Sequence, residues 1–415
     1  MKVFIQNTLT RNKDVFKPRK DKEVKMFTCG PSVYNLPHIG NYRTYLFEDV
    51  MERLLEFMGY RVNRMLNFTD VEDKAVNEAR SRGLQSLEEL TRPNEEQFFK
   101  DAQALKIRIP AQIPRSSTSV EQAVDLILRL LDQKHAYWHG RDVFFDPLTY
   151  EGFGRLYGLD MSQWPSQKVR FRKDTYPGQR WNLGDFILWH GAKKGDPFSW
   201  ETRLGYGRPS WNIQDPAMIS KHMGFELDIF CGGVDNLYRH HDYNLAVMET
   251  VSGTTLASCW MHGEHLLVDG IKMSKSKGNI VYPSDLYQKE WSSDFLRFFL
   301  LSMHYRAKLD LNDAAIDQAW KRFTSLRSLV RDFLHSKAGS GDVGHNNAGP
   351  VVRTMLDGSL VFLADDLDIP SAVNFLIKTL EQLQAMKQDK KLSSDDLENI
   401  LYGLDKLDQI LGFIF

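Results

Sequence analysis

The fold of this chain is decided by the stretch Thr28-Cys29-Gly30-Pro31-Ser32-Val33-Tyr34-Asn35-Leu36-Pro37-His38-Ile39-Gly40-Asn41. Residues 24–28 before it are apolar at alternate positions, and after it apolar residues recur at helical spacing from Leu46 to Met58. The pattern predicts a strand, a loop and a helix. A helix entered through such a loop presents unpaired backbone N–H groups and the positive end of its dipole, so phosphate is the natural ligand.

A second loop far along the chain is rich in lysine and small residues. It reads Gly270-Ile271-Lys272-Met273-Ser274-Lys275-Ser276-Lys277-Gly278-Asn279. Glycine and serine make such a loop mobile, and its ammonium groups can close onto a polyphosphate. Taken alone, it is equally well interpreted as a solvated basic turn, because short charged motifs match by chance.

The two loops together resemble the paired "HIGH" and "KMSKS" loops that hold ATP in class I aminoacyl-tRNA synthetases. The sequence between and around them narrows the resemblance to the cysteinyl type, in family order over nearly the whole chain. The matching segments are Cys29-Gly30-Pro31, Asn67-Phe68-Thr69-Asp70-Val71-Glu72-Asp73-Lys74, Gly207-Arg208-Pro209-Ser210-Trp211, Gly232-Gly233-Val234-Asp235, His240-His241 and Trp260-Met261-His262.

The resemblance implies an α/β fold, a Rossmann-like parallel sheet split by an insertion and followed by a C-terminal α-helical bundle. Periodicity in the first part agrees with this, since it predicts a second strand over 62–68 and a helix over 71–82 that ends before Gly83. Thr69 and Asp70 then follow a strand, at the sheet edge where ligands bind. The expected parts are the first catalytic half (1–113), the connective insertion (114–207), the second catalytic half (208–292), a stem-contact-like helical region (293–335) and an acidic helical bundle (336–415).

The last part of the chain is acidic. Residues 341–415 carry 6 Lys and Arg against 12 Asp and Glu, a net charge of −6 that leaves +5 for residues 1–340 of a chain whose total is −1. An acidic surface suits a nucleic-acid backbone poorly. Cysteinyl-tRNA synthetases usually continue into a small anticodon-reading domain, which we expect to be absent here.

Composition places the protein in a broad class. The chain has 415 residues, 42% of them hydrophobic, enough for two or three domains with real cores. Its three cysteines, Cys29, Cys231 and Cys259, do not make a disulfide framework, which favours a reducing compartment. The N-terminus soon turns polar and no apolar run approaches the length of a membrane span. We expect a soluble cytoplasmic protein without a membrane partner.

The chemistry implied by the resemblance is activation of a carboxylate. An amino-acid carboxylate attacks the α-phosphorus of ATP, giving an aminoacyl-adenylate and pyrophosphate, and an acceptor then takes the acyl group. Such transfer depends on positioning and neutralised charge more than on a protein nucleophile. His38 and Asn41 are expected to hydrogen-bond the phosphates, and Gly40 to let the backbone approach the nucleotide. Lys272 and Lys275 are expected to hold the leaving pyrophosphate, while Mg²⁺ arrives with ATP.

Other family positions are expected around the substrates. Asp235 matches a position near the adenosine, and Thr69 and Trp211 match positions near the amino acid. Asn41 stands where the family usually has histidine, and its amide can still donate a hydrogen bond.

The amino-acid pocket departs from the family pattern. Cysteinyl synthetases hold zinc with Cys, Cys, His and Glu, and the zinc binds the substrate thiolate. Aligned on the motifs, the four positions are Cys29, Asp215, His240 and Asn244. Two interpretations stay open: Cys29, Asp215 and His240 hold zinc with Asn244 as a weak fourth ligand, or zinc is lost and Asp215 and Asn244 bind a different amino acid.

Three hypotheses for the acceptor follow. The first is a cysteine–tRNA ligase, charging through contacts with the tRNA acceptor stem. The second is a tRNA-independent ligase that joins cysteine or another amino acid to a small amine, resembling the mycothiol-pathway enzyme on the same scaffold. The third is a non-catalytic paralogue that binds ATP or a protein. Intact His38, Lys272 and Lys275 argue against the third, and we expect the family activity.

Overall fold

A four-stranded parallel sheet lies at the centre of the molecule. The computed structural model describes residues 1–160, 185–336, 349–389 and 391–415, and the side chain of Lys275 lies outside this description. The sheet order is β11-β10-β3-β4, with β10 parallel to both of its neighbours. The strands are β3 (Glu23–Thr28), β4 (Arg61–Leu66), β10 (Leu227–Gly233) and β11 (Ala257–Gly263). The predicted α/β class with a parallel sheet is confirmed.

The sheet joins two distant parts of the sequence at a switch point. From β3 the chain crosses through α1 (Ile39–Phe57) to β4, and from β10 it crosses through α6 (Asp242–Ser252) to β11 on the other side. Cys231 of β10 pairs with Thr28 of β3, and the Cys29 N–H donates to the Cys231 carbonyl at 3.1 Å. Ligands bind in parallel sheets where neighbouring strands diverge in this way.

The elements that follow β4 differ slightly from the sequence prediction. The strand expected over 62–68 ends at Leu66, because the Asn67 side chain turns inward to accept from the Gly30 N–H at 2.9 Å. The helix expected over 71–82 is α2 (Asp73–Ser81), and Glu72 in extended conformation precedes it. Helix α3 (Glu88–Ala104) comes next and contributes Phe98 to the core beneath α1.

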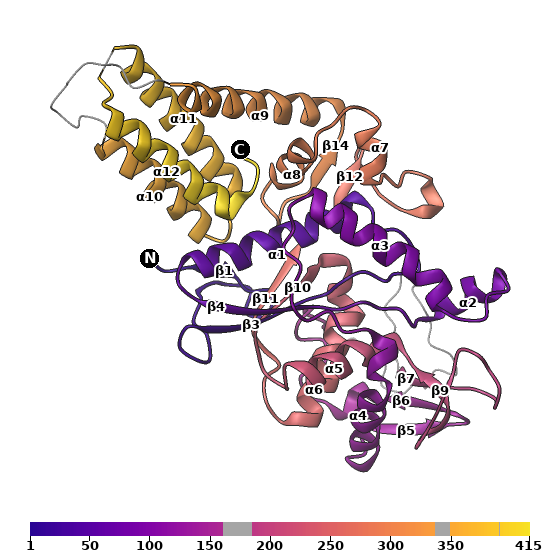
Figure 1. Ribbon diagram of the computed structural model, residues 1–415. Helices are drawn as coiled ribbons and strands as arrows, with labels where there is room; N and C mark the ends of the chain where they lie inside the picture. Colours follow the sequence, from indigo (N-terminus) through magenta and orange to yellow (C-terminus); the bar gives the residue numbers. More distant parts are fainter. Residues whose placement is uncertain (161–184, 337–348, 390) are drawn as a thin grey trace.

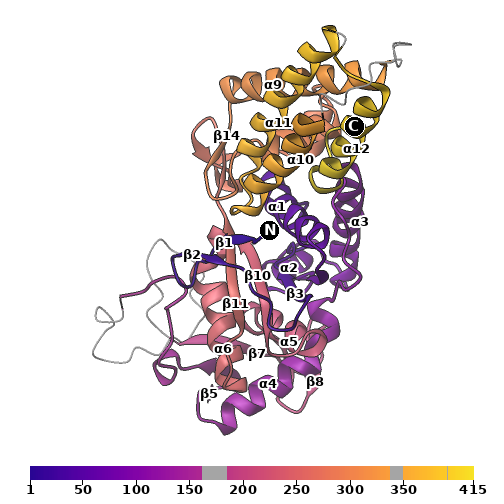
Figure 2. The ribbon, with the colours of Figure 1, turned by 90° about the vertical axis from the view of Figure 1, so that its left-hand side faces the viewer.

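A second, antiparallel sheet forms the opposite end of the molecule. Its order is β5-β6-β7-β9-β8, and it packs with α4 and α5 around a separate cluster of buried side chains. The elements are α4 (Val120–Asp132), β5 (Ala136–His139), β6 (Asp142–Phe145), β7 (Phe186–Gly191), β8 (Trp200–Thr202), β9 (Gly205–Pro209) and α5 (Trp211–His222). In Figures 1 and 2 this sheet lies below the parallel sheet, and the C-terminal helices lie above it.

The C-terminal part is helical and docks onto α1. Its helices and small strands are β12 (Leu266–Val268), β13 (Ile271–Lys272), α7 (Pro283–Tyr287), α8 (Ser293–Leu301), β14 (Leu309–Leu311), α9 (Asp313–Leu334), α10 (Gly349–Ala364), α11 (Ile369–Gln388) and α12 (Ser394–Leu411). Arg297 of α8 is fully buried and donates to Asp49 Oδ2 at 2.8 Å and to the Leu411 carbonyl at 2.6 Å. This arginine therefore ties α8 and α12 to α1.

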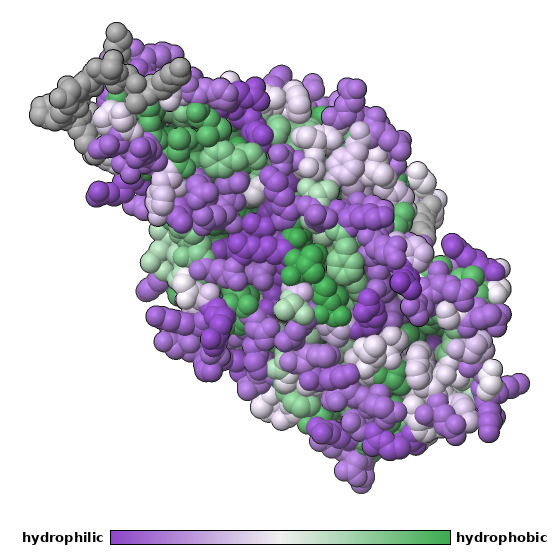
Figure 3. Space-filling view, in the orientation of Figure 1, coloured by the Kyte–Doolittle hydropathy of each residue, from purple (hydrophilic) through white to green (hydrophobic). Residues whose placement is uncertain are grey.

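The N-terminal hairpin reaches the same helices. Strands β1 (Phe4–Gln6) and β2 (Lys13–Val15) pair antiparallel, and the Gln6 N–H donates to Asp366 Oδ1 at 2.8 Å. Hydrophilic residues cover most of the face shown in Figure 3, with smaller hydrophobic patches over the C-terminal helices and near the centre. Across the described residues, no helix has the length and apolar character that a membrane span requires.

Candidate active site

A cavity of about 350 Å³ opens at the carboxyl ends of β3 and β10. Its walls come from the loop after β3, the start of α1, the segment after β4, the start of α5 and the loop after β10. The predicted site residues that line it are Cys29, His38, Asn41, Thr69, Trp211 and Asp235. A larger cavity of about 760 Å³ lies between α3 and the segment around Phe198, and none of these predicted residues lines it.

His38 and Asn41 together cap the first turn of α1. His38 Nδ1 accepts from the Asn41 backbone N–H at 3.3 Å, and Asn41 Oδ1 accepts from the His38 N–H at 3.0 Å. Both side chains are thereby held at the positive end of the helix dipole. Burial lowers the pKa of His38 below its ordinary value, against an opposing effect of Asp235, so the imidazole is neutral at physiological pH.

The lysine-rich loop closes onto the same helix end. Met273 is buried, and a Cβ placed on Gly40 would lie 2.9 Å from Met273 Cε. The Ile39 N–H donates to the Val281 carbonyl at 3.0 Å, which also joins the start of α1 to the segment just after the loop. Lys272 in β13 lines a small adjoining cavity of about 70 Å³ together with His38, Asn41 and Asp235. Lys275 begins a short 3₁₀ turn, and the position of its side chain is not described.

Backbone pairing shapes the entrance to the amino-acid pocket. The Thr69 N–H donates to the Pro31 carbonyl at 3.1 Å, and the Val33 N–H donates to the Thr69 carbonyl at 3.1 Å. A Cβ on Gly30 would lie 1.8 Å from the Asn67 carbonyl oxygen, so only glycine permits this approach. The segment after β4 is thus clamped against the loop after β3.

Glu72 is a cavity residue to which the sequence reasoning gave no role. It lines the cavity beside Lys74, and burial raises the pKa of its carboxyl to about 7, against an opposing effect of Lys74. A carboxyl whose pKa lies near the working pH changes charge readily when a ligand enters. In the sequence, the signal for Glu72 is its place three residues after Thr69 in the family-like segment 67–74.

Asp215 of α5 is the centre of a buried polar cluster. Its Oδ2 lies 2.7 Å from His240 Nε2, accepts from Asn244 Nδ2 at 3.1 Å and lies 3.8 Å from Cys29 Sγ. Its Oδ1 accepts from Asn67 Nδ2 at 2.9 Å. The structure therefore brings together all four residues aligned with the zinc positions, and Asn67 joins them. Cys29 lines the cavity, whereas Asp215, His240 and Asn244 are buried beneath it.

A distorted turn positions the histidine. The chain from Leu237 to His241 leaves regular helical geometry, and Arg239 has a φ of 76°. Such backbone strain in a non-glycine residue persists where the surrounding structure holds it, often at functional sites. The turn places the His240 ring flat against Trp211, with ring centroids 3.8 Å apart and planes 7° apart.

His241 and His262 extend the cluster in a direction that the sequence did not predict. His241 Nδ1 lies 2.8 Å from His262 Nε2, and His262 Nδ1 lies 2.8 Å from Thr8 Oγ1. Burial lowers the pKa of both rings, that of His262 to about 3, so both are neutral. The sequence predicted a zinc position at His240 but no role for His241.

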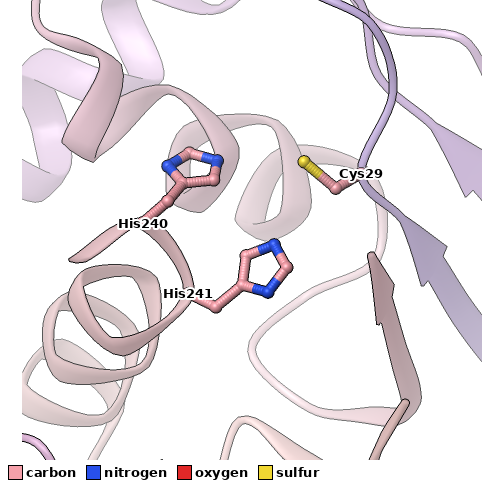
Figure 4. A group of neighbouring side chains, drawn as sticks. All are labelled: Cys29, His240 and His241. Carbon is pink, nitrogen blue, oxygen red and sulfur yellow. The ribbon is translucent and has the colours of Figure 1, made fainter. Parts of the chain in front are cut away.

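Cys29 faces both histidines of this pair (Figure 4). Its Sγ and one ring nitrogen from each of His240 and His241 lie within 4.8 Å of one another. Burial, together with the nearby Asp215 carboxylate, raises the pKa of the Cys29 thiol well above its ordinary value. A soft sulfur and two imidazoles are ligands that zinc prefers, and a metal ion would favour the thiolate.

Comparison with known proteins agrees with this geometry. The family described as tRNA synthetases class I (C) catalytic domain matches residues 15–321. The cysteine–tRNA ligase of Chlamydia muridarum is 35% identical over 425 residues, covering 100% of this chain and 88% of the relative. That of Chlamydia pneumoniae is 36% identical, covering 99% and 86%.

Solved structures share the fold at low sequence identity. The Mycobacterium tuberculosis methionyl-tRNA synthetase in complex with methionyl-adenylate superposes with a TM-score of 0.66 at 16% identity, covering 94% of this chain and 93% of that one. A leucyl-tRNA synthetase from Agrobacterium radiobacter, in a ternary complex, gives a TM-score of 0.66 at 11% identity, covering 96% and 85%. Both likenesses support the arrangement of the parallel sheet and its helices.

Proposed function

We propose that this protein activates cysteine and transfers it to tRNA. The chain belongs to the class I aminoacyl-tRNA synthetases of the cysteinyl type and is thus an ATP-dependent ligase. Relatives that match the whole chain are named cysteine–tRNA ligases, which favours tRNA over a small amine as the acceptor. The cavity at the sheet edge is the proposed site of both half-reactions.

One observation carries the proposal. Met273 packs directly against Gly40, and so the loop that carries Lys272 is closed onto the helix end that carries His38. A phosphate chain lying in the adjoining cavity would meet the positive end of α1 on one side and an ammonium group on the other. Clamps of this kind stabilise charge that develops on transferring phosphoryl oxygens.

The adenylation step assigns a role to each side chain. The amino-acid carboxylate attacks the α-phosphorus of ATP, and the bond from that phosphorus to the bridging oxygen of pyrophosphate breaks. Neutral His38 and the Asn41 amide are the proposed hydrogen-bond donors to the phosphates. Lys272 and Lys275 are the proposed partners of the leaving pyrophosphate, and Mg²⁺ bound with ATP would neutralise part of its charge. Asp235, which borders both cavities, is the proposed contact for the adenosine.

The amino acid is proposed to lie between Cys29, Thr69 and Trp211, which line the same cavity. Asp215 and Asn244 do not line this cavity. Asp215 contacts His240 Nε2 and Asn244 donates to Asp215, so their proposed role is to position His240. The donor set around Cys29 fits a zinc ion, with Cys29 and His240 among its ligands. Bound zinc would supply a soft Lewis acid that distinguishes a thiol from a hydroxyl.

The test is amino-acid-dependent exchange of pyrophosphate into ATP, measured with each of the twenty amino acids in the absence of tRNA. Exchange with cysteine alone, followed by charging of tRNA from the same organism, is the expected result. Exchange with a different amino acid would overturn the cysteine assignment. Exchange with cysteine but no charging, combined with transfer to an amine, would overturn the tRNA acceptor. A Lys272→Ala variant serves as the catalytic control.

A further inference from the structure

We propose that zinc is held here by Cys29, His240 and His241, so that His241, and not Asn244, completes the set of protein ligands. This ligand set differs from the zinc site that the sequence left open as one of two interpretations, which contained Asp215 and a weak Asn244. The inference rests on the proposed function only for the role of the ion, which would present its open position to the substrate thiol.

The three donor atoms already converge. The Cys29 Sγ and one nitrogen from each imidazole lie within 4.8 Å of one another, and Figure 4 shows both rings turned toward the sulfur. Zinc bonds of about 2.0–2.3 Å in a tetrahedral site put neighbouring donor atoms about 3.3–3.6 Å apart. Small side-chain rotations are therefore enough to close the set around an ion.

His241 has a nitrogen that no protein group uses. Among the described residues, its Nε2 has no hydrogen-bond partner, although the residue is fully buried. A buried polar atom without a partner is unfavourable and rare in folded proteins, so such an atom calls for an explanation. A metal ion beside Cys29 would be its partner. The Asn244 Oδ1 also has none among the described groups, but the Asn244 amide is turned so that its NH₂ faces Asp215.

The opposite nitrogen of His241 is fixed by a hydrogen-bonded chain. His241 Nδ1 contacts His262 Nε2 at 2.8 Å, and His262 Nδ1 contacts Thr8 Oγ1 at 2.8 Å. If each imidazole donates its Nδ1–H along this chain, the lone pair of His241 Nε2 is left free. Metal-binding histidines are commonly oriented in this way by a partner on their other nitrogen.

Asp215 supplies the charge that the ion needs. Its carboxylate is fully buried, lies 2.7 Å from His240 Nε2 and 3.8 Å from Cys29 Sγ, and so borders the position of the ion. A zinc ion with one thiolate carries a net positive charge, which the neighbouring carboxylate would balance. Buried charges are stable where such pairing exists.

The absence of a side chain at Gly232 leaves room for the His241 ring. A Cβ on Gly232 would lie 2.5 Å from His241 Cε1 and 3.5 Å from Cys29 Cβ. Any side chain at this position would push the His241 ring out of place. The backbone of β10 thus helps to fix the position of the His241 imidazole, the third proposed zinc ligand.

The experiment is metal binding by the full-length protein, stripped with a chelator and reloaded with Zn²⁺ or Co²⁺ in the absence of ATP and amino acid. We expect one ion per chain, with a cobalt spectrum showing thiolate charge transfer and tetrahedral coordination. His241→Gln should lose at least about 100-fold in affinity. His262→Gln, which disturbs only the orientation, should lose about 10- to 100-fold.

Two controls separate this ligand set from the alternatives. Asn244→Ala should keep the cobalt spectrum, and its metal affinity should lie within a few-fold of that of the parent protein. The same result is expected for His222→Ala, which alters an exposed histidine at the end of α5. Thermal unfolding of each variant shows whether it is folded. Unchanged metal affinity in folded His241→Gln, loss of metal in Asn244→Ala, or no metal uptake by the parent protein would each overturn the inference. Since no substrate is present, these outcomes are independent of the exchange assay.

Discussion

Replacing Gly40 with alanine places a methyl group between the two signature loops. The added Cβ would lie 2.9 Å from Met273 Cε and 3.1 Å from His38 Nδ1. The optimal van der Waals separation of two carbon atoms is about 3.5–4.0 Å. Met273 is buried, so its methyl group cannot swing into solvent, and moving it off its rotamer costs about 0.5–1.5 kcal/mol. The His38 ring is held by its bond with the Asn41 N–H. We therefore expect the loop carrying Lys272 to shift.

The expected effect falls on catalysis and not on folding. A misplacement of about 1 Å in a catalytic group can cost about 100-fold in rate, so the rate of pyrophosphate exchange should fall about 10- to 100-fold, equivalent to about 1.4–2.7 kcal/mol. Alanine in the first turn of α1 improves helix propensity by about 0.5–1 kcal/mol over glycine, which offsets the crowding. The melting temperature should therefore change little.

A double-mutant cycle tests the cause. In Gly40→Ala with Met273→Ala, the methyl group that meets the new Cβ is gone, and the exchange rate should recover relative to the product of the two single effects. Met273→Ala alone is the matched control for lost packing. If the two effects simply multiply, or if Gly40→Ala exchanges at the parent rate, then contact between the loops does not position Lys272.

Three further predictions concern stability and charge. Arg297→Met breaks a fully buried ion pair with Asp49 and should lower the free energy of unfolding by about 3–5 kcal/mol in denaturant titration; a loss under 1 kcal/mol would contradict this. Both carboxyl oxygens of Glu48 lack partners among the described residues, and burial raises the pKa of this group well above 4.5. The folded protein therefore keeps a proton that the unfolded chain loses. As the pH rises above 4.5 toward the raised pKa, the free energy of unfolding should fall by about 1.4 kcal/mol per pH unit. Glu48→Gln should remove this slope, and an unchanged slope would assign it to another group. Lys272→Ala should slow exchange by at least about 100-fold with unchanged thermal stability, whereas Lys321→Ala on α9 should exchange normally.

Much of the fold was predictable because its signals are local. The strand, loop and helix around His38 follow from hydrophobic periodicity within about thirty residues, and the structure has them as β3 and α1. The ends of elements were less predictable. β4 stops at Leu66 because Asn67 bonds to Gly30, which lies 37 residues earlier in the chain.

The sequence by itself determined the family, the parallel sheet and the residues of the two loops that are expected to bind phosphate. The loop motifs are short and local, and the parallel sheet follows from the family resemblance that these motifs carry. It also identified Cys29, Asp215, His240 and Asn244 as neighbours, through their alignment with the family. It did not separate their roles.

Only the tertiary structure decided how those polar groups face one another. The strained turn at Arg239 and the pairing of β10 with β3 bring His241 beside Cys29, while Asp215 is enclosed by hydrogen bonds from Asn67 and Asn244. No local pattern encodes this, because the direction of each donor depends on where distant backbone segments cross. Residue identity can be read along the chain, but the convergence of donor atoms is a property of the packed fold.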